Sequence, residues 1–313
     1  MTRFIPALLV STALVACAPE SSEIEEVEIA EAEAAVEASV PSVPTLTESW
    51  VVEGLAQPES VIETPDGTGY FVSLVGGEST GQDNNGAIAI ISKDGTLTDG
   101  SWVTGTEEVP LNAPKGMAIV ENEKGVTLLV TDVDHIAFIL VDEGRLAKRL
   151  PAPGASFLND VTKGPGASAF ISDSRNARIY KLENDEITVW LEDERLGGVK
   201  GLQMEGDALL ISTMSAGELL SVDLETKAIT GLAAGMENAD GIGVRADGSY
   251  MLSSWPGQLW HVREGEAPTM MLDTRVETVG QENVIAMNDV LFLDDIAIAP
   301  NWFPGSVRAY RIE

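Results

Sequence analysis

Hydrophobic and polar positions follow a short repeated pattern along the chain after residue 47. One unit lies between Glu237 and Trp260, where the polar Asp240 precedes the apolar run Ile242 to Val244. An Asp247-Gly248 turn separates this run from a second one, Tyr250 to Ser253. Because Asp-Gly between two apolar runs is typical of a tight turn, the pattern predicts a β-hairpin.

The same pattern recurs six times, each time after a polar residue that we call the entrance residue. The entrance residues are Glu59, Lys115, Asn159, Lys200, Asp240 and Asn288. Their spacing of 40 to 56 residues suits the four-stranded blades of a β-propeller. No stretch after residue 47 keeps an apolar period of 3.6 over a helical length. The sequence therefore predicts an all-β fold, a six-bladed β-propeller with four-stranded blades.

The ends of the repeat predict how the ring closes. The sixth copy runs out of chain after its third strand, Val307 to Ile312, whereas the strand Glu48 to Val52 is left over before the first copy. An unpaired edge is a liability in a sheet protein. We therefore expect the N-terminal strand to complete the last blade.

The first 46 residues read as export and tether signals. Arg3 and the apolar run Phe4 to Ala16 predict a signal peptide over residues 1–16, since the run is short for a membrane span. The run Leu14-Val15-Ala16-Cys17 resembles the lipobox of bacterial lipoproteins, which implies lipidation of Cys17. An ordinary signal peptide with an incidental cysteine is the alternative.

Residues 17–46 are rich in Ala and Glu and predict a flexible acidic tether, although transient helix is conceivable, before a propeller over residues 47–313. Cys17 is the single cysteine, so an internal disulfide is ruled out. Ala18 supplies no acidic inner-membrane retention signal after the cysteine. We expect a bacterial cell-envelope protein on the periplasmic side of the outer membrane, in contact with the membrane through its lipid only.

The charge of the chain narrows the class of partner. With 50 acidic residues against 19 Lys and Arg, the formal net charge is −31. An acidic surface repels phosphate and releases no counterions, so nucleic acid is excluded as a partner. A cationic small molecule or a divalent metal is favoured instead.

Strand direction predicts where chemistry occurs. Directions alternate within a blade, so the entrance residues and the loops between second and third strands lie on one face. The entrance residues should therefore surround the mouth of the central channel, and these loops bring His135, Trp255 and Trp302 towards it.

Two blades resemble a known family. The segments FLNDVTKGPGASAFISDS and ENADGIGVRADGSYMLSS resemble the regucalcin and gluconolactonase family, and the likeness covers about residues 47–313. It implies a metal-dependent hydrolase of a lactone or ester, with one divalent metal, often calcium. It further implies that Glu59, Asn159 and Asp240 bind the metal, with Asn288 as a further donor and Asp240 also as general base.

The residue chemistry agrees with this implication in part. Calcium takes carboxylate and amide oxygens, and a bound metal polarises a carbonyl. Lys115 and Lys200, however, stand between these ligands and bring the formal charge of the ring to zero. They oppose metal binding, or they hold an anionic substrate or a developing oxyanion.

A metal-free ring is the alternative. In a six-fold ring Glu59 stands opposite Lys200 and Lys115 opposite Asp240, with Asn159 opposite Asn288, so that ion pairs could balance the charges.

For the aromatic and histidine candidates, structural roles are equally open. His135 could simply bond to Asp132 or Asp134, and Trp255 and Trp302 could cap their blades. Two functions follow: a hydrolase for a small-molecule lactone or ester, or a non-catalytic module that binds a ligand or an envelope protein.

Overall fold

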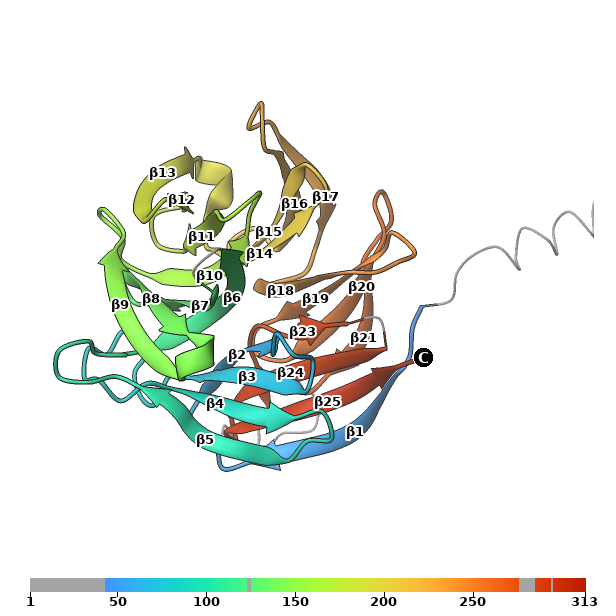
Figure 1. The fold of residues 1–313 in the computed structure, drawn as a ribbon. Helices are drawn as coiled ribbons and strands as arrows, with labels where there is room; N and C mark the ends of the chain where they lie inside the picture. Colours follow the sequence, from blue (N-terminus) through green and yellow to red (C-terminus); the bar gives the residue numbers. More distant parts are fainter. Residues whose placement is uncertain (1–42, 123–124, 276–284, 294) are drawn as a thin grey trace, which may run out of the picture. The chain divides into compact units, whose positions relative to one another are not determined.

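A computed structural model describes residues 43–122, 125–275, 285–293 and 295–313. Residues 1–42 lie outside the described part, and so do the predicted signal peptide, Cys17 and most of the predicted tether. The described chain consists almost wholly of β-strands, arranged as six blades around a central channel (Figure 1). This confirms the predicted six-bladed propeller. Within these ranges no helix is long and apolar enough to span a membrane.

Each of the first five blades is a sheet of four sequential antiparallel strands, with the first strand innermost. Blades one to three comprise β2 (Pro58–Glu63), β3 (Gly69–Leu74), β4 (Ala87–Ser92) and β5 (Leu97–Thr104); β6 (Pro114–Asn122), β7 (Gly125–Asp132), β8 (His135–Leu140) and β9 (Arg145–Pro151); and β10 (Leu158–Lys163), β11 (Ala169–Asp173), β12 (Arg178–Glu183) and β13 (Glu186–Glu192). Blades four and five comprise β14 (Val199–Glu205), β15 (Ala208–Thr213), β16 (Glu218–Asp223) and β17 (Ile229–Ala234); and β18 (Ala239–Val244), β19 (Tyr250–Ser254), β20 (Gln258–Val262) and β21 (Thr269–Asp273).

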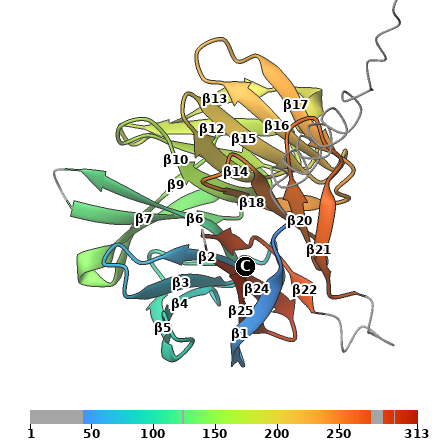
Figure 2. The same cartoon turned by 90° about the vertical axis from the view of Figure 1, so that its right-hand side faces the viewer.

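The sixth blade takes strands from both ends of the chain. Its strands are β22 (Ala286–Met287), β23 (Leu291–Phe292), β24 (Ile296–Phe303), β25 (Ser306–Ile312) and β1 (Leu46–Glu53). β22 and β23 both pair with β24, as two pieces of one broken inner strand. β1 pairs antiparallel with β25 along its length, from Leu46 opposite Ile312 to Glu53 opposite Ser306. Figure 2 shows β1 at the outer side of this blade. The predicted closure by the N-terminal strand is confirmed.

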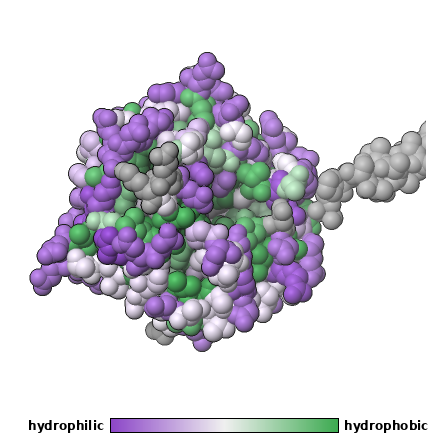
Figure 3. Space-filling model, in the orientation of Figure 1, coloured by the Kyte–Doolittle hydropathy of each residue, from purple (hydrophilic) through white to green (hydrophobic). Residues whose placement is uncertain are grey.

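Apolar side chains between neighbouring blades form the core. Val72 and Ile91 of the first blade, for example, pack with Ile298 and Val307 of the sixth. Inner and middle strands are buried, whereas an outer strand such as β5 is mostly exposed. The surface in Figure 3 is accordingly hydrophilic around much of its periphery, with hydrophobic residues towards the middle of the ring. The blades therefore bury their faces against one another, as a propeller requires.

A break in strand register places the entrance residues. In each of the first five blades the ladder between first and second strands shifts just after the first paired residue, as between Pro58 and Val61 or between Ala239 and Ile242. An irregularity of this kind takes residues out of the ladder and re-aims their side chains. Two residues are released in each of these five blades, the entrance residue and the residue after it.

Hydroxyl groups on the second strands of blades two to five tie each of these blades to the next. Thr131, Ser172, Ser212 and Ser253 each donate to the backbone carbonyl of the following blade's entrance residue. We call these four residues the hydroxyl latches. Between the sixth and first blades the backbone N–H of Asp289 donates to the Glu59 carbonyl instead, at 3.2 Å. The entrance residues thus stand on a backbone that is fixed from both sides.

Candidate functional site at the channel mouth

A cavity of about 240 Å³ opens at the entrance-residue end of the channel. Four entrance residues line it: Glu59, Lys115, Lys200 and Asn288. The loops above add Trp255 and Trp302, as predicted, together with Ser79, Phe157 and Met214. The structure therefore brings most of the predicted site residues together around one small polar floor with aromatic walls.

Three predicted residues lie away from the cavity wall. His135 bonds through Nδ1 to Asp134 Oδ1 at 2.6 Å, as the structural interpretation expected, and does not line the cavity. Asn159 and Asp240 are almost fully buried and do not line the cavity. Asn159 donates through Nδ2 to Glu59 Oε1 at 3.3 Å, so it belongs to the same cluster.

The ion pairing differs from the cross-ring arrangement expected. Lys200 Nζ lies 3.7 Å from Asp240 Oδ2 on the neighbouring blade. Lys115 donates instead to the Ala113 carbonyl at 2.8 Å, and its ammonium lies 5.0 Å from the centroid of the Phe157 ring. The close ion pair of Lys200 is thus with Asp240, whereas Glu59 and Lys200 attract each other at longer range. A lysine stem reaches a neighbouring blade more easily than it spans the channel.

Burial shifts the protonation of this cluster. It raises the pKa of Glu59 to about 8, although Lys200 pulls it down. Burial also lowers the pKa of Lys115 to about 8, against the attraction of Glu59. Burial also lowers the pKa of Lys200, but the attraction of Asp240 and Glu59 outweighs burial, so that the pKa of Lys200 is raised. Glu59 and Lys115 are thus both able to exchange protons near neutral pH.

Three buried carboxylate oxygens have no hydrogen-bond partner among the described residues: Glu59 Oε2, Asp240 Oδ1 and Asp240 Oδ2. Leaving a buried acceptor unsatisfied costs about 1–3 kcal/mol, and more for a charged group. Such atoms indicate a site that receives a hydrogen-bond donor or a cation from outside.

A divalent metal does not fit this ring as its side chains lie. The predicted ligand set holds only two carboxylates, Glu59 and Asp240, beside the amides of Asn159 and Asn288. Moreover, a calcium ion about 2.4 Å from Asp240 Oδ2 would lie within about 6 Å of the Lys200 ammonium. At an effective dielectric constant near 20, this repulsion is about 5 kcal/mol. Calcium binding by Glu59, Asn159, Asp240 and Asn288 stays a prediction, and the position of Lys200 opposes it.

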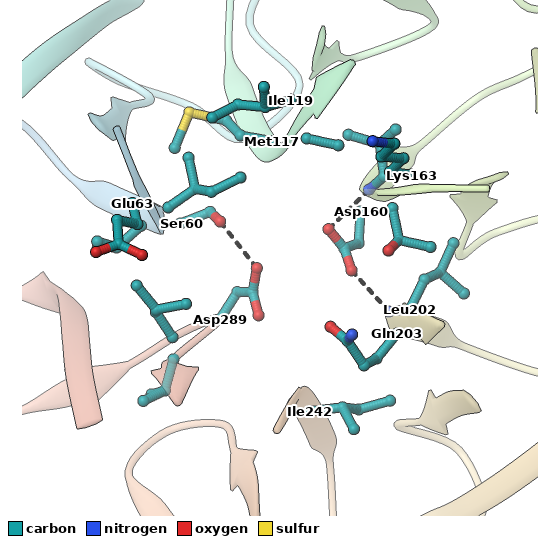
Figure 4. Close-up of a pocket in the computed structure, with 17 residues that line it drawn as sticks. Ser60, Glu63, Met117, Ile119, Asp160, Lys163, Leu202, Gln203, Ile242 and Asp289 are labelled. Atoms are coloured by element: carbon teal, nitrogen blue, oxygen red, sulfur yellow. Dashed lines mark hydrogen bonds between the residues drawn. The ribbon is translucent and has the colours of Figure 1, made fainter. Parts of the chain in front are cut away.

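The opposite end of the channel holds a second cavity, of about 340 Å³ (Figure 4). The residues that follow three of the entrance residues, Ser60, Asp160 and Asp289, point into it from opposite sides. Asp289 accepts from Ser60 Oγ at 2.8 Å, and Asp160 accepts the backbone N–H groups of Val161 and Leu202. Burial raises the pKa of Asp289 to about 7 and that of Asp160 well above its usual range.

Sequence reasoning did not find this second cavity. The signal was the position after each entrance residue, which reads Ser, Gly, Asp, Gly, Gly, Asp around the ring. The glycines leave room for their neighbours, because a Cβ on Gly116 would lie 2.4 Å from Asp160 Oδ1 and one on Gly241 2.5 Å from Asp289 Oδ1.

Two aspartates that end second strands serve the loops of the mouth. Asp132 accepts the Ala113 N–H at 2.8 Å and pairs with Arg149 at 2.8 Å. Asp173 accepts the Phe157 N–H at 3.2 Å. They hold the backbone beside Lys115 and under the Phe157 ring.

Comparisons with known proteins show the fold. No family model matches the chain, and no curated protein matches it. Virginiamycin B lyase from Staphylococcus aureus superposes with a TM-score of 0.61 at 13% identity, over 86% of this chain and 99% of the lyase. A catalytically inactive variant of that lyase with quinupristin gives 0.58 at 13% identity, over 86% and 99% of the two chains. A protein provisionally described as a gluconolactonase gives 0.59 at 13% identity, over 87% and 93%. At this identity the likeness shows a shared six-bladed propeller, and membership of the regucalcin and gluconolactonase family stays a prediction.

Proposed function

We propose that the channel mouth hydrolyses a small hydroxylated lactone or ester without a bound metal. One observation carries this proposal: Glu59, which has a buried carboxyl oxygen without a hydrogen-bond partner among the described residues, lines one cavity together with Lys115 and Lys200. A carboxyl group able to exchange protons near neutral pH, beside two cations, is suited to acyl transfer.

The walls of the cavity support a compact substrate. At about 240 Å³ the space lies below the usual range of about 300–1,000 Å³ for ligand pockets. Substrate hydroxyls would donate to the carboxyl group of Glu59. The substrate carbonyl would face Lys115 and Lys200, while the less polar side of the lactone ring would rest on Trp255 and Trp302.

The proposed reaction uses one carboxyl group twice. Ionised Glu59 takes a proton from a water molecule while the oxygen of that water attacks the carbonyl carbon of the substrate. The two ammonium groups stabilise the oxyanion that forms. The ring C–O bond then breaks, and Glu59 returns the proton to the leaving oxygen. One water is consumed and one hydroxy acid is released. Asp240 was the expected general base, but it does not line the cavity and it pairs with Lys200, so we assign it the positioning of Lys200.

A second candidate is a non-catalytic module that binds a small ligand or an envelope protein. The Lys200–Asp240 pair favours it, since this pair balances charge inside the ring without any turnover.

We also propose that the chain is anchored in the bacterial envelope through Cys17. The support is the lipobox-like run before this cysteine. Radioactive palmitate should label the wild type and not Cys17→Ser. Label that persists in Cys17→Ser, or no label in the wild type, would reject the anchor.

A panel of hydroxylated lactones and small esters tests the hydrolase, with rates measured for wild type, Glu59→Gln and Glu63→Gln. Glu63 lines the cavity at the opposite end and serves as the matched control. Loss of a general acid-base group should lower kcat/KM by about 10²–10⁴-fold in Glu59→Gln only. Binding of panel members without turnover would support the second candidate, and full activity in Glu59→Gln would reject the assignment.

A further inference from the structure

Hydrogen bonds to the backbone hold Lys200 in place independently of the contacts of its side chain. Its carbonyl accepts the Ser172 hydroxyl at 2.8 Å, and the N–H of Gly201 donates to Ser212 Oγ at 2.8 Å. A Cβ on Gly201 would lie only 2.3 Å from the Asp240 carbonyl oxygen, so the two strands are in close contact here. The stem of Lys200 therefore begins at a fixed point beside the strand that carries Asp240.

The ammonium of Lys200 lies beside the unpartnered oxygens of Asp240. It lies 3.7 Å from Asp240 Oδ2, and its side chain is 12% exposed against 1% for Asp240. Lys115, in contrast, is turned to the Ala113 carbonyl and the Phe157 ring. The two lysines are therefore not equivalent, and it is Lys200 that pairs with a carboxylate.

The groups around this ammonium are hard oxygen donors. Asp240 and Glu59 have three buried carboxylate oxygens without a hydrogen bond among the described residues. Asn159 lies against Glu59 at 3.3 Å and could present its amide oxygen after a rotation of the side chain. Carboxylate and amide oxygens are the ligands that calcium prefers.

We propose that Lys200 is a built-in cation that occupies the place of a divalent metal, and that its removal opens a calcium site formed by Glu59, Asn159 and Asp240. The wild type then binds calcium weakly or not at all at this ring. The proposal does not rest on the hydrolase, because it concerns metal binding alone.

Substitution of one lysine at a time separates this role from a general effect of charge. Lys200→Met removes the ammonium and keeps an unbranched stem of similar length. Lys115→Met removes the same charge from the same cavity and is the matched control. The double variant Lys200→Met/Asp240→Asn removes the ammonium and a ligand together, and should neither need nor bind calcium.

The measurement is calcium binding to the full chain by calorimetry, with melting temperatures at increasing calcium, at about pH 8.5 because metal ligands must be deprotonated. We expect a saturable rise in melting temperature for Lys200→Met, as mass action requires for a ligand of the native state. Wild type and Lys115→Met should bind at least ~100-fold more weakly, given the repulsion from Lys200.

Three results would overturn the proposal. The first is a wild type that binds calcium as tightly as Lys200→Met. The second is a folded Lys200→Met that binds none. The third is failure of both Lys200→Met and Lys200→Gln to fold with and without calcium, because the ring would then need the ammonium itself and not merely a positive charge. A negative lactone panel with calcium binding confined to Lys200→Met would reject the hydrolase and leave this inference standing.

Discussion

The hydroxyl of Ser172 donates to the backbone carbonyl of Lys200 at 2.8 Å and accepts the N–H of Asp160 at 2.9 Å. One buried side chain thus joins the third blade to the fourth and fixes two channel residues at once. Thr131, Ser212 and Ser253 make the corresponding bond to the next blade.

Removal of one latch should destabilise the ring. Ser172→Ala leaves a buried carbonyl and a buried N–H without this partner, which should lower the free energy of unfolding by about 1–3 kcal/mol. Urea unfolding followed by circular dichroism measures it. Ser101→Ala, at an exposed serine of β5, should stay within about 0.5 kcal/mol of wild type. Equal midpoints for the two variants would contradict the structural role of the latch.

The buried carboxyl groups should make stability fall as pH rises. Burial raises the pKa of Glu59 from 4.5 to about 8, so the folded state holds a proton that the unfolded state has released between these values. The contribution of Glu59 to the free energy of unfolding is therefore fully present below about pH 4.5 and is lost progressively as the pH rises to about 8. Asp289, with a pKa raised to about 7, acts in the same direction.

This slope can be assigned by substitution. The free energy of unfolding, measured from pH 5 to pH 8, should decline less steeply in Glu59→Gln than in wild type. Glu53→Gln changes an exposed carboxylate of β1 and should keep the wild-type slope. A slope unaltered by Glu59→Gln would show that Glu59 does not hold the proton.

The closing strand should be needed for stability. Deletion of residues 47–53 removes most of the pairing of β1 with β25 and the packing of Val52 on Val307 and Ile298. We expect a melting temperature lower by several degrees, since it leaves the last blade with an open edge. Thr47→Ala, an exposed position in the same strand, should melt as wild type does. An undiminished melting temperature after the deletion would contradict the closure.

Lys115 should contribute to turnover more than to stability. Lys115→Met removes an oxyanion-stabilising cation from the cavity wall and should lower kcat by about 10²–10³-fold on any lactone that the panel identifies. Lys163→Met changes an exposed lysine at the opposite cavity and should have no effect. Equal loss in both variants would indicate a general charge effect and remove Lys115 from the site.

The sequence could predict the ring because its signals are local and repeated. The Asp247-Gly248 turn and the apolar run Tyr250 to Ser253 placed β19 within one residue of its observed bounds, and the unused N-terminal strand predicted the closure. The inner strand of the sixth blade was harder to predict from the sequence, because Asn288 and Asp289 interrupt it between β22 and β23.

The sequence predicted which residues belong to the site, but it did not predict which of them contact one another. Register placed Lys200 and Asp240 on neighbouring blades, but only side-chain reach and burial decide that they pair. The repeat did not predict the roles of Asp160 and Asp289, because the position after the entrance residue is Gly in three of the six blades. The role of the latches could not be read from a serine or threonine at a strand end, because their partners lie one blade away.

The measurement that tests the central claim most directly is the hydrolysis rate of the fastest-cleaved lactone after exhaustive treatment with a chelator. Because Lys200 and Lys115 supply the positive charge at the mouth, we expect the chelated chain to retain the rate of the untreated chain, with no gain on addition of calcium. The same chelated rate should fall at least ~100-fold in Glu59→Gln. Loss of activity on chelation, with recovery on addition of calcium, would contradict a metal-free site.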